Sequence, residues 1–250
     1  MDRRQISATA HAERPIAAPL GDDSVRALLE RALPGGAPRL LDLGCGAGTW
    51  MVRAHAARPG LLADGVDDDA ETIAAARRTV TDAGLGDRIA FHARDAAQFT
   101  SPHRYDAVLS IGAAHAFGGL LPTLEAARGH LAPGGSVLVG DCFWEREPGR
   151  KTLDHGFAAT DYDDLATTVD RVTAEGWTPV HGHVSTLREW DDYEWSWTGT
   201  LSRWALDRPG HPDSGAALKA AAEHRDAWLH GYRGTLGFVT LVLRRTLPGG

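Results

Sequence analysis

Residues Leu40-Leu41-Asp42-Leu43-Gly44-Cys45-Gly46-Ala47-Gly48-Thr49 combine a short apolar strand with a turn rich in glycine. Glycines at the end of a strand allow a sharp backbone turn and let a ligand approach without interference from a Cβ atom. A helix is predicted to follow the turn, to about Arg58, and its first N–H groups are open to a phosphate or carboxylate. The stretch therefore predicts a strand–turn–helix unit with a ligand site at the carboxyl end of the strand.

Apolar strands and helices alternate on both sides of this stretch. A helix is expected over 22–33 and the first strand over 39–43. Strands separated by helices of about 10–15 residues are typical of a parallel, doubly wound sheet. The sequence predicts an α/β fold with a mostly parallel, seven-stranded sheet and a C-terminal helical elaboration. The further strands are expected at 62–67, 88–93, 105–112, 136–141, 178–185 and 235–244, and the further helices at 70–83, 120–131, 162–175, 189–206 and 214–232.

The domain organisation follows from where this alternation begins and changes. Residues 1–37 are predicted to form an N-terminal arm, extended over 1–20, and its helix. Residues 38–143 carry the regular alternation and form the ligand-binding core. In residues 144–250 the alternation of strands and helices is no longer regular, although no low-complexity linker separates them from the core. These residues are expected to form a C-terminal elaboration of the same single domain.

Composition excludes several classes of protein. The 250 residues carry a formal net charge of −7, which disfavours a nucleic-acid surface because phosphate neutralisation needs clustered Lys and Arg. The sequence has no apolar run long enough for a membrane span and no signal-like start. Cys45 and Cys142 are too few for a disulfide framework or a cysteine-rich zinc site. A cytoplasmic globular protein, monomeric or homodimeric, is expected.

The glycine spacing distinguishes two classes of cofactor. A dinucleotide turn has the pattern G-x-G-x-x-G/A, and Thr49 stands where its third small residue belongs. The glycines here follow G-x-G-x-G, with Asp42 two residues before the first. This pattern resembles the first motif of class I S-adenosylmethionine-dependent methyltransferases, which have a Rossmann-like fold. Four more segments match that family in order and spacing, so that the resemblance covers roughly residues 38–143; they are 65–67, 95–96, 105–108 and 131–135.

The resemblance implies S-adenosyl-L-methionine as cofactor and S-adenosyl-L-homocysteine as product. It implies that Asp67 accepts hydrogen bonds from the ribose hydroxyls and that Asp95 and Ala96 lie beside the adenine. Asp42 would support the glycine loop. Asp68 adds a carboxylate beside the ribose site, although Asp68 or Asp69 can instead cap the next helix. The remaining cofactor-binding residues that it implies are Gly44, Cys45, Gly46, Gly48, Thr49 and Ile111; no metal is implied.

Two catalytic candidates follow strands that end at the expected ligand edge of the sheet. His115 comes just after the fourth strand and is a candidate general base, needed if the acceptor loses a proton. The alternative is that it contacts the cofactor or packs as a neutral ring. Asp141 ends the fifth strand and could orient a substrate or a metal, or cap the next turn.

The C-terminal third has an unusual number of tryptophans. Trp190, Trp197 and Trp204 recur every seven residues and would form one stripe on a helix, either lining an acceptor pocket or facing the core. Such a pocket would suit a planar, apolar or cationic small molecule. Tyr193 and Glu194 are candidate polar contacts. Arg233 would meet an acidic group of the substrate or form a surface salt bridge. The expected substrate-binding residues are His115, Trp144, Tyr193, Trp197 and Arg233.

The resulting functional hypothesis is methyl transfer to a small-molecule acceptor, with natural-product tailoring as a setting that the Ala/Gly/Arg-rich composition favours. One alternative keeps the cofactor but catalyses cyclisation or elimination. A second is a nicotinamide-dependent oxidoreductase, and a third is a non-catalytic binder.

Overall fold

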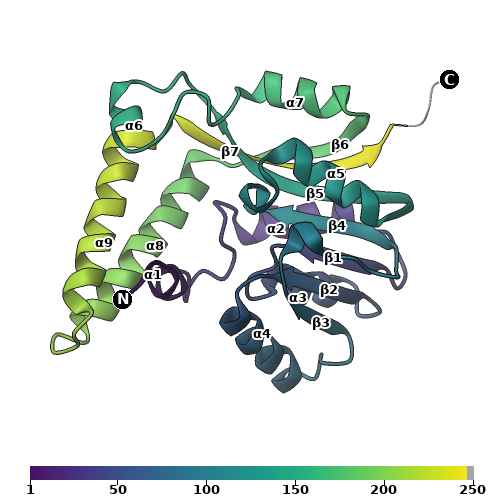
Figure 1. Cartoon of the computed structure of the whole chain (residues 1–250), viewed down its shortest axis with the longest axis horizontal. Coiled ribbons are helices and arrows are strands. Elements are labelled where there is room, and N and C mark those ends of the chain that lie inside the picture. The colour runs from purple at the N-terminus through teal and green to yellow at the C-terminus, as the bar shows by residue number, and fades with distance from the viewer. Residues whose placement is uncertain (247–250) are drawn as a thin grey trace. The chain divides into compact units, whose positions relative to one another are not determined.

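The predicted alternation of strands and helices is confirmed by the structure, a computed structural model that describes residues 1–246 (Figure 1). The described residues include seven strands in one sheet, in the order β3-β2-β1-β4-β5-β7-β6. Pairings among β1 to β5 are parallel, whereas β6 and β7 pair antiparallel. The strands are β1 (Arg39–Leu43), β2 (Leu62–Asp67), β3 (Ile89–Ala93), β4 (Tyr105–Ile111), β5 (Leu131–Trp144), β6 (Trp177–Val184) and β7 (Leu236–Arg245).

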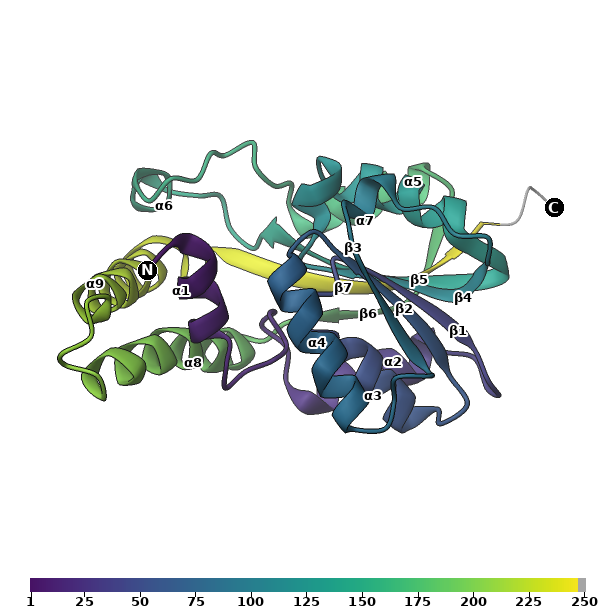
Figure 2. The ribbon, with the colours of Figure 1, turned by 60° about the horizontal axis from the view of Figure 1, so that its bottom comes forward.

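Helices cover both faces of this sheet, which explains the almost continuous apolar character of β1 and β4. Figure 2 shows α2, α3 and α4 on one face and α5 and α7 on the other. These helices span α2 (Asp22–Ala32), α3 (Thr49–Ala57), α4 (Ala70–Asp82), α5 (Leu120–His130) and α7 (Leu165–Ala174). Their buried apolar positions follow helical spacing, as in α4 with Ile73, Ala76 and Val80.

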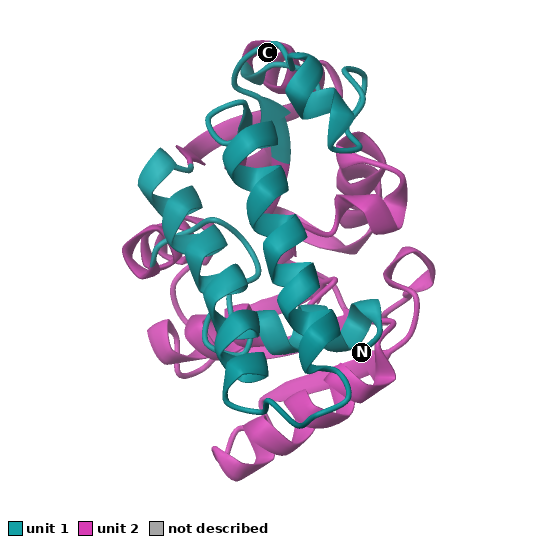
Figure 3. Ribbon diagram, turned by 90° about the vertical axis from the view of Figure 1, so that its left-hand side faces the viewer, with its two compact units in different colours: residues 1–21, 142–165, 185–238 teal, residues 22–141, 166–184, 239–250 magenta. Residues whose placement is uncertain are grey.

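The chain divides into two compact units, coloured separately in Figure 3. Unit 2 holds residues 22–141, 166–184 and 239–250, of which 247–250 lie outside the described residues, and contains most of the sheet. Unit 1 holds residues 1–21, 142–165 and 185–238. Its elements are α1 (Arg3–Ala10), α6 (Arg150–Asp154), α8 (Leu187–Leu206), α9 (Ser214–Asp226) and η3 (Ala227–Tyr232).

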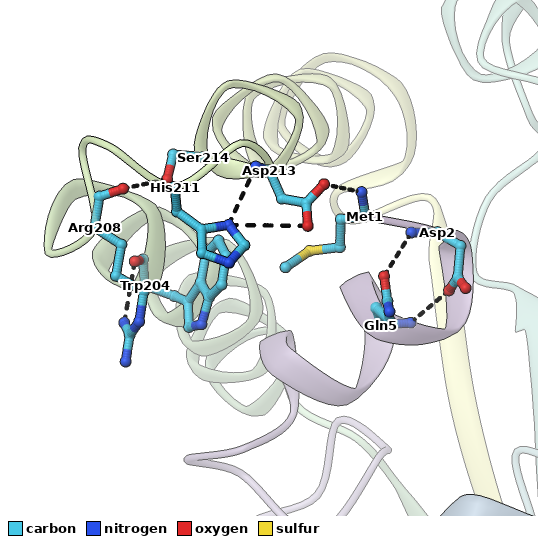
Figure 4. Close-up of polar contacts among 8 residues, drawn as sticks. All are labelled: Met1, Asp2, Gln5, Trp204, Arg208, His211, Asp213 and Ser214. Atoms are coloured by element: carbon cyan, nitrogen blue, oxygen red, sulfur yellow. Dashed lines mark hydrogen bonds and ion pairs between the residues drawn. The ribbon is translucent and has the colours of Figure 1, made fainter.

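The prediction of an extended arm over residues 1–20 is wrong for its first half. Residues 3–10 form α1, because the Asp2 side chain accepts from the backbone of Gln5 and the Gln5 side chain accepts from the backbone of Asp2. Figure 4 shows this capping box and the ion pair between the Met1 amino group and Asp213. Within unit 1, Ala10 packs with an apolar cluster of α8 and α9, so tertiary contacts stabilise a helix that its own sequence marks weakly.

Two other elements differ from their predicted bounds by more than three residues. β5 is longer than the expected 136–141 at both ends: Leu131 already pairs with Tyr105 before a register shift restores pairing at Ser136, and the strand continues to Trp144. The helix expected over 214–232 is α9 followed by a six-residue π-helical segment, η3. Neither difference changes the order of the elements.

The glycine turn is packed too tightly at Gly44 for any side chain. Gly44 has φ +82°, and a Cβ atom there would lie 2.4 Å from the Cβ of Ala113. We expect Gly44→Ala to lower the free energy of unfolding by about 2–4 kcal/mol, from left-handed strain and overpacking together. Urea denaturation followed by circular dichroism measures the change.

Gly84→Ala is the matched control, because Gly84 has a similar φ of +71° but open space at its Cβ position. It should cost only the strain, about 1–2 kcal/mol. Equal losses in the two variants would contradict the packing argument.

Candidate functional site

The cofactor candidates of unit 2 gather where β1 and β2 end. In the sheet, Asp42 lies beside Gly65 of β2 and Leu109 of β4. The backbone N–H groups of Gly44 and Cys45 both donate to the carbonyl of Val66, at 2.8 and 3.0 Å. The turn after β1 is therefore held against the end of β2, as a ligand site formed by the ends of both strands requires.

Asp67 is the centre of this arrangement. Its Oδ2 accepts from the N–H of Gly46 at 2.9 Å, and its Oδ1 accepts from the N–H of Asp69 at 3.0 Å. A carboxylate has about four lone-pair positions, so Asp67 can accept further hydrogen bonds from a ligand. Gly46 has φ +50°, and no heavy atom lies within 4 Å of the place where a Cβ would stand, which leaves its surface open to a ligand.

Asp42 is a buried acid with an unsatisfied oxygen. Its side chain is only 2% exposed, and Oδ2 has no hydrogen-bond partner among the described residues. Burial, with a smaller effect of the negative charge on Asp67, raises the pKa of Asp42 to about 7. A positive group placed nearby would favour the charged form of this carboxyl.

The other cofactor candidates have separate local roles. Gly48, with φ +76°, precedes α3, and Thr49 is the first residue of that helix. Cys45 is buried, and burial raises the pKa of its thiol, so it is held as a neutral thiol. Ile111 ends β4 and pairs with Gly140 of β5.

The acidic residues that follow β2 and β3 differ in whether they cap a helix and in how exposed they are. Asp69, rather than Asp68, caps α4 by accepting from the N–H groups of Glu71 and Thr72; Asp68 is exposed. Asp95 is exposed and accepts from the N–H of Ala97 at the start of the short helix η1 (Ala96–Gln98), whose first residue, Ala96, is buried.

The two catalytic candidates lie where the pairing of the neighbouring parallel strands β4 and β5 ends in unit 2. His115 lies exposed in the short helix η2 (Ala114–Phe117), just after β4. Asp141 follows Gly140 of β5, which pairs with the last residue of β4. Both side chains therefore belong to the carboxyl edge of the sheet, where ligands bind in open α/β folds.

The expected acceptor residues of unit 1 have protein partners of their own. Trp144 donates its indole N–H to the carbonyl of Ala159 at 3.0 Å. The Arg233 guanidinium makes two hydrogen bonds of 2.8 Å with Asp191, which is the salt bridge considered as its alternative.

Tyr193 and Trp197 lie near a group of polar side chains that the spacing did not reveal. The Tyr193 hydroxyl contacts Nε2 of His11 at 3.1 Å, and Trp197 stacks on the ring of His224 with centroids 3.9 Å apart. His224 in turn contacts Glu194, which is 2% exposed. The signal in the sequence was an acid at helical spacing within the apolar stripe of Trp190 and Leu201. Its partner on α9, thirty residues away, carries no local signal.

None of the helices within residues 1–246 has the length and apolar character needed to cross a membrane. The same residues contain no group of three or more His, Cys, Asp or Glu side chains placed to hold a metal ion.

The comparisons with known proteins agree with this geometry. Residues 40–135, which include the glycine turn and Asp67, match the family model described as a methyltransferase domain. This match agrees with the resemblance to class I S-adenosylmethionine-dependent methyltransferases that the glycine motif and the following segments carry.

The relatives extend over almost the whole chain. The protein is 28% identical to "Uncharacterized protein YjhP" of Escherichia coli (strain K12), over 89% of this chain and 90% of that protein. Its fold is similar to that of a Geobacter sulfurreducens methyltransferase in complex with S-adenosyl-L-homocysteine, with a TM-score of 0.87 and 22% identity. The match covers 96% of this chain and 98% of the other. The fold is also similar to that of the [4+2]-cyclase SpnF, with a TM-score of 0.70 and 20% identity. That match covers 91% of this chain and 81% of the cyclase chain.

The buried Asp42 should make stability depend on pH. Its pKa is raised in the folded state, so the folded protein holds a proton that the unfolded chain has already lost. The stabilisation is complete below about pH 4 and disappears as the pH rises through about 7. In urea denaturation between pH 4 and 8, Asp42→Asn should gain stability relative to wild type as the pH rises, by up to about 4 kcal/mol.

Asp82→Asn removes an acid from the exposed end of α4 and serves as the control. Its difference from wild type should stay within about 0.5 kcal/mol across the same range. A pH-independent difference for Asp42→Asn would show that Asp42 has an ordinary pKa in the folded protein.

Proposed function

We propose that this protein transfers the methyl group of S-adenosylmethionine to a small-molecule acceptor in the cytoplasm. The observation that carries the proposal is the Asp67-centred site, where one carboxylate holds the glycine loop at Gly46 and still has lone pairs for a ligand. The net charge of −7 supports a small molecule over a nucleic acid.

The residues present fit the cofactor. In the resemblance, Asp67 accepts from the ribose hydroxyls, Asp95 and Ala96 lie beside the adenine, and the glycine loop faces the methionine end. The unsatisfied Oδ2 of Asp42 suits the positive ammonium of that end, directly or through water. Gly44, Cys45, Gly48, Thr49 and Ile111 shape the loop and its surroundings, with Asp68 at the rim.

The chain's own residues have a limited task in this chemistry. When bound, the cofactor supplies an activated methyl group with a good leaving group. The protein then has to hold the acceptor at attack distance and exclude water. We assign His115, just after β4, and Asp141, within β5, to contact and orientation of the acceptor. Trp144, Tyr193 and Trp197 belong to the acceptor side in unit 1, whereas Arg233 is engaged with Asp191.

Cofactor binding tests the site directly. Isothermal titration with S-adenosyl-L-homocysteine should show at least about tenfold weaker binding for Asp67→Asn, because a charged acceptor of the ribose hydroxyls is lost. Asp82→Asn makes the same change of charge on the outer end of α4 and should bind as wild type does. Unchanged affinity in Asp67→Asn would remove Asp67 from the site.

The reaction type needs a separate assay. The protein is incubated with S-adenosylmethionine and a panel of phenols, amines and carboxylic acids, and products are analysed by mass spectrometry. We expect S-adenosylhomocysteine together with an acceptor that has gained the mass of one methylene group. A product of unchanged mass, such as a cyclase like SpnF would make, would contradict methyl transfer. Binding of a nicotinamide dinucleotide in place of S-adenosylmethionine would favour an oxidoreductase.

A further inference from the structure

The aromatic ring of Phe91 lies against the glycine turn of unit 2. Phe91 is in the middle of β3 and is 5% exposed. A Cβ atom at position 48 would stand 2.6 Å from both Cε1 and Cζ of this ring. Two carbon atoms that are not bonded to each other do not fit so closely. The outer edge of the ring therefore occupies the place that a side chain of residue 48 would take, in direct contact with Gly48.

The sheet brings the ring to this place because β2 has no side chain at the paired position. Phe91 pairs with Gly65 of β2, and paired residues of parallel strands point to the same face. A Cβ atom at Gly65 would lie 2.3 Å from Cε of Met51 and 2.8 Å from Sγ of Cys45. The turn and the start of α3 therefore lie directly on the backbone of β2, within reach of the ring on β3.

Phe91 is itself held by α4. The Arg77 side chain of that helix donates from Nη2 to the carbonyl of Phe91 at 2.6 Å. The cap of α4 is Asp69, whose N–H donates to Asp67. The carboxylate that holds the turn at Gly46 is thus linked through α4 to the strand that carries the ring.

Gly48 decides how the turn leads into α3. It is the N-cap residue of that helix, with φ +76° and no side chain to satisfy the first N–H groups. Its N–H donates to the carbonyl of Cys45 at 2.9 Å, and its carbonyl accepts from the N–H of Val52 at 3.1 Å. The conformation of this one residue therefore sets the direction in which the first N–H groups of α3 point.

Phe91 is better suited than Met51 to fix Gly48 relative to the sheet. Cε of Met51 also approaches, at 3.2 Å from the place of a Cβ on Gly48. Met51, however, belongs to α3 and moves with it, and its three rotatable bonds adapt to their surroundings. The ring of Phe91 is rigid and belongs to a separate strand.

We propose that Phe91 is a positioning residue for the cofactor, whose ring holds Gly48 in the conformation in which the turn and the start of α3 receive the amino acid end of S-adenosylmethionine. This inference rests on the proposed function, in which the glycine loop faces the methionine end. The adenosine end belongs to Asp67 and Asp95 and depends less on Phe91. The ring acts through Gly48 and needs no contact with the cofactor.

The contact acts on the population of loop conformations. A glycine adopts positive and negative φ with similar ease, so Gly48 without a neighbour leaves the left-handed region at little cost. The ring removes that freedom before the ligand arrives, and less conformational entropy is then lost on binding. If the loop without this contact keeps the competent conformation about a tenth of the time, the apparent affinity falls about tenfold.

Phe91→Leu removes the contact with a small change in the core. Leucine keeps Cβ, Cγ and both Cδ atoms but lacks Cε1 and Cζ, the two atoms that approach Gly48. We expect about tenfold weaker binding of S-adenosylhomocysteine in isothermal titration. Binding of 5′-methylthioadenosine, which has the adenosine and the sulfur but no amino acid part, should weaken less than about twofold in competition titrations. Equal losses for the two ligands would overturn the proposal.

Amide hydrogen exchange in the protein without ligand gives a second measure. In Phe91→Leu, exchange followed by NMR should accelerate at least about fivefold at the N–H groups of Gly48 and Val52. The N–H groups of Gly44 and Cys45 donate to β2 in the same turn and should change less than about twofold. A loss of stability of the whole protein would instead accelerate all four alike. Unchanged exchange at Gly48 would overturn the proposal.

Phe99→Leu is the matched control, because it makes the same change at another buried ring of unit 2. Phe99 is 7% exposed, and its ring centroid lies 5.1 Å from that of His92 and 5.7 Å from that of His130. Neither neighbour belongs to the glycine turn, so the ratio of the two affinities and the exchange at Gly48 should stay as in wild type. Equal changes in Phe99→Leu and Phe91→Leu would overturn the proposal.

Phe91→Met is the rescue variant. Its unbranched side chain is long enough to reach Gly48 again, and we expect its affinity for S-adenosylhomocysteine to lie within about threefold of wild type. An affinity as low as that of Phe91→Leu would show that the reach of the side chain is not what matters and would overturn the proposal.

Failure of the proposed function would look different. It would appear as absent binding of S-adenosylhomocysteine to wild type, or as absent methyl transfer to the whole acceptor panel. The exchange rates report on Phe91 without any ligand. Binding of S-adenosylhomocysteine to wild type with an unaltered Phe91→Leu variant would overturn the role of Phe91 alone.

Discussion

The hydrogen bonds that Asp67 accepts from the backbone are the constraint on which the cofactor side of the protein depends. One oxygen holds the glycine turn at Gly46, and the other holds Asp69, which caps α4. The same carboxylate therefore fixes the loop after β1, ends β2 and positions the next helix. Its charge also contributes to the raised pKa of Asp42. A loop organised before the ligand arrives has less conformational entropy to lose on binding.

The sheet could be predicted because its information is local. Apolar runs, glycine turns and helical spacing occur within single elements, and short connections determine their order. The first helix could not be predicted in this way. Residues 3–10 are polar on most sides, and their helix depends on the Asp2–Gln5 capping box and on packing of Ala10 with residues of α8 and α9. Contacts across two hundred residues leave no periodic signal.

The candidate residues of the two units differ in the same way. The glycine loop and Asp67 were visible because their spacing from strand ends is short and regular. The cluster around Glu194 was not, because its members come from residues 11, 193, 194, 224 and 232 and meet only after unit 1 folds. An acid on an apolar helical stripe was the single hint. The structure also pairs Arg233 with Asp191, an outcome that the sequence left open.

A crystal structure of the protein with S-adenosylhomocysteine would show whether Asp67 holds both the glycine loop and the cofactor. We expect the ribose hydroxyls to lie within hydrogen-bond distance of the Asp67 carboxylate while Gly46 N–H still donates to the same group. We also expect Asp42 to lie nearer the methionine end than the adenine. A nucleoside bound away from the end of β2, or a glycine loop released from Asp67 in the complex, would contradict the role of Asp67.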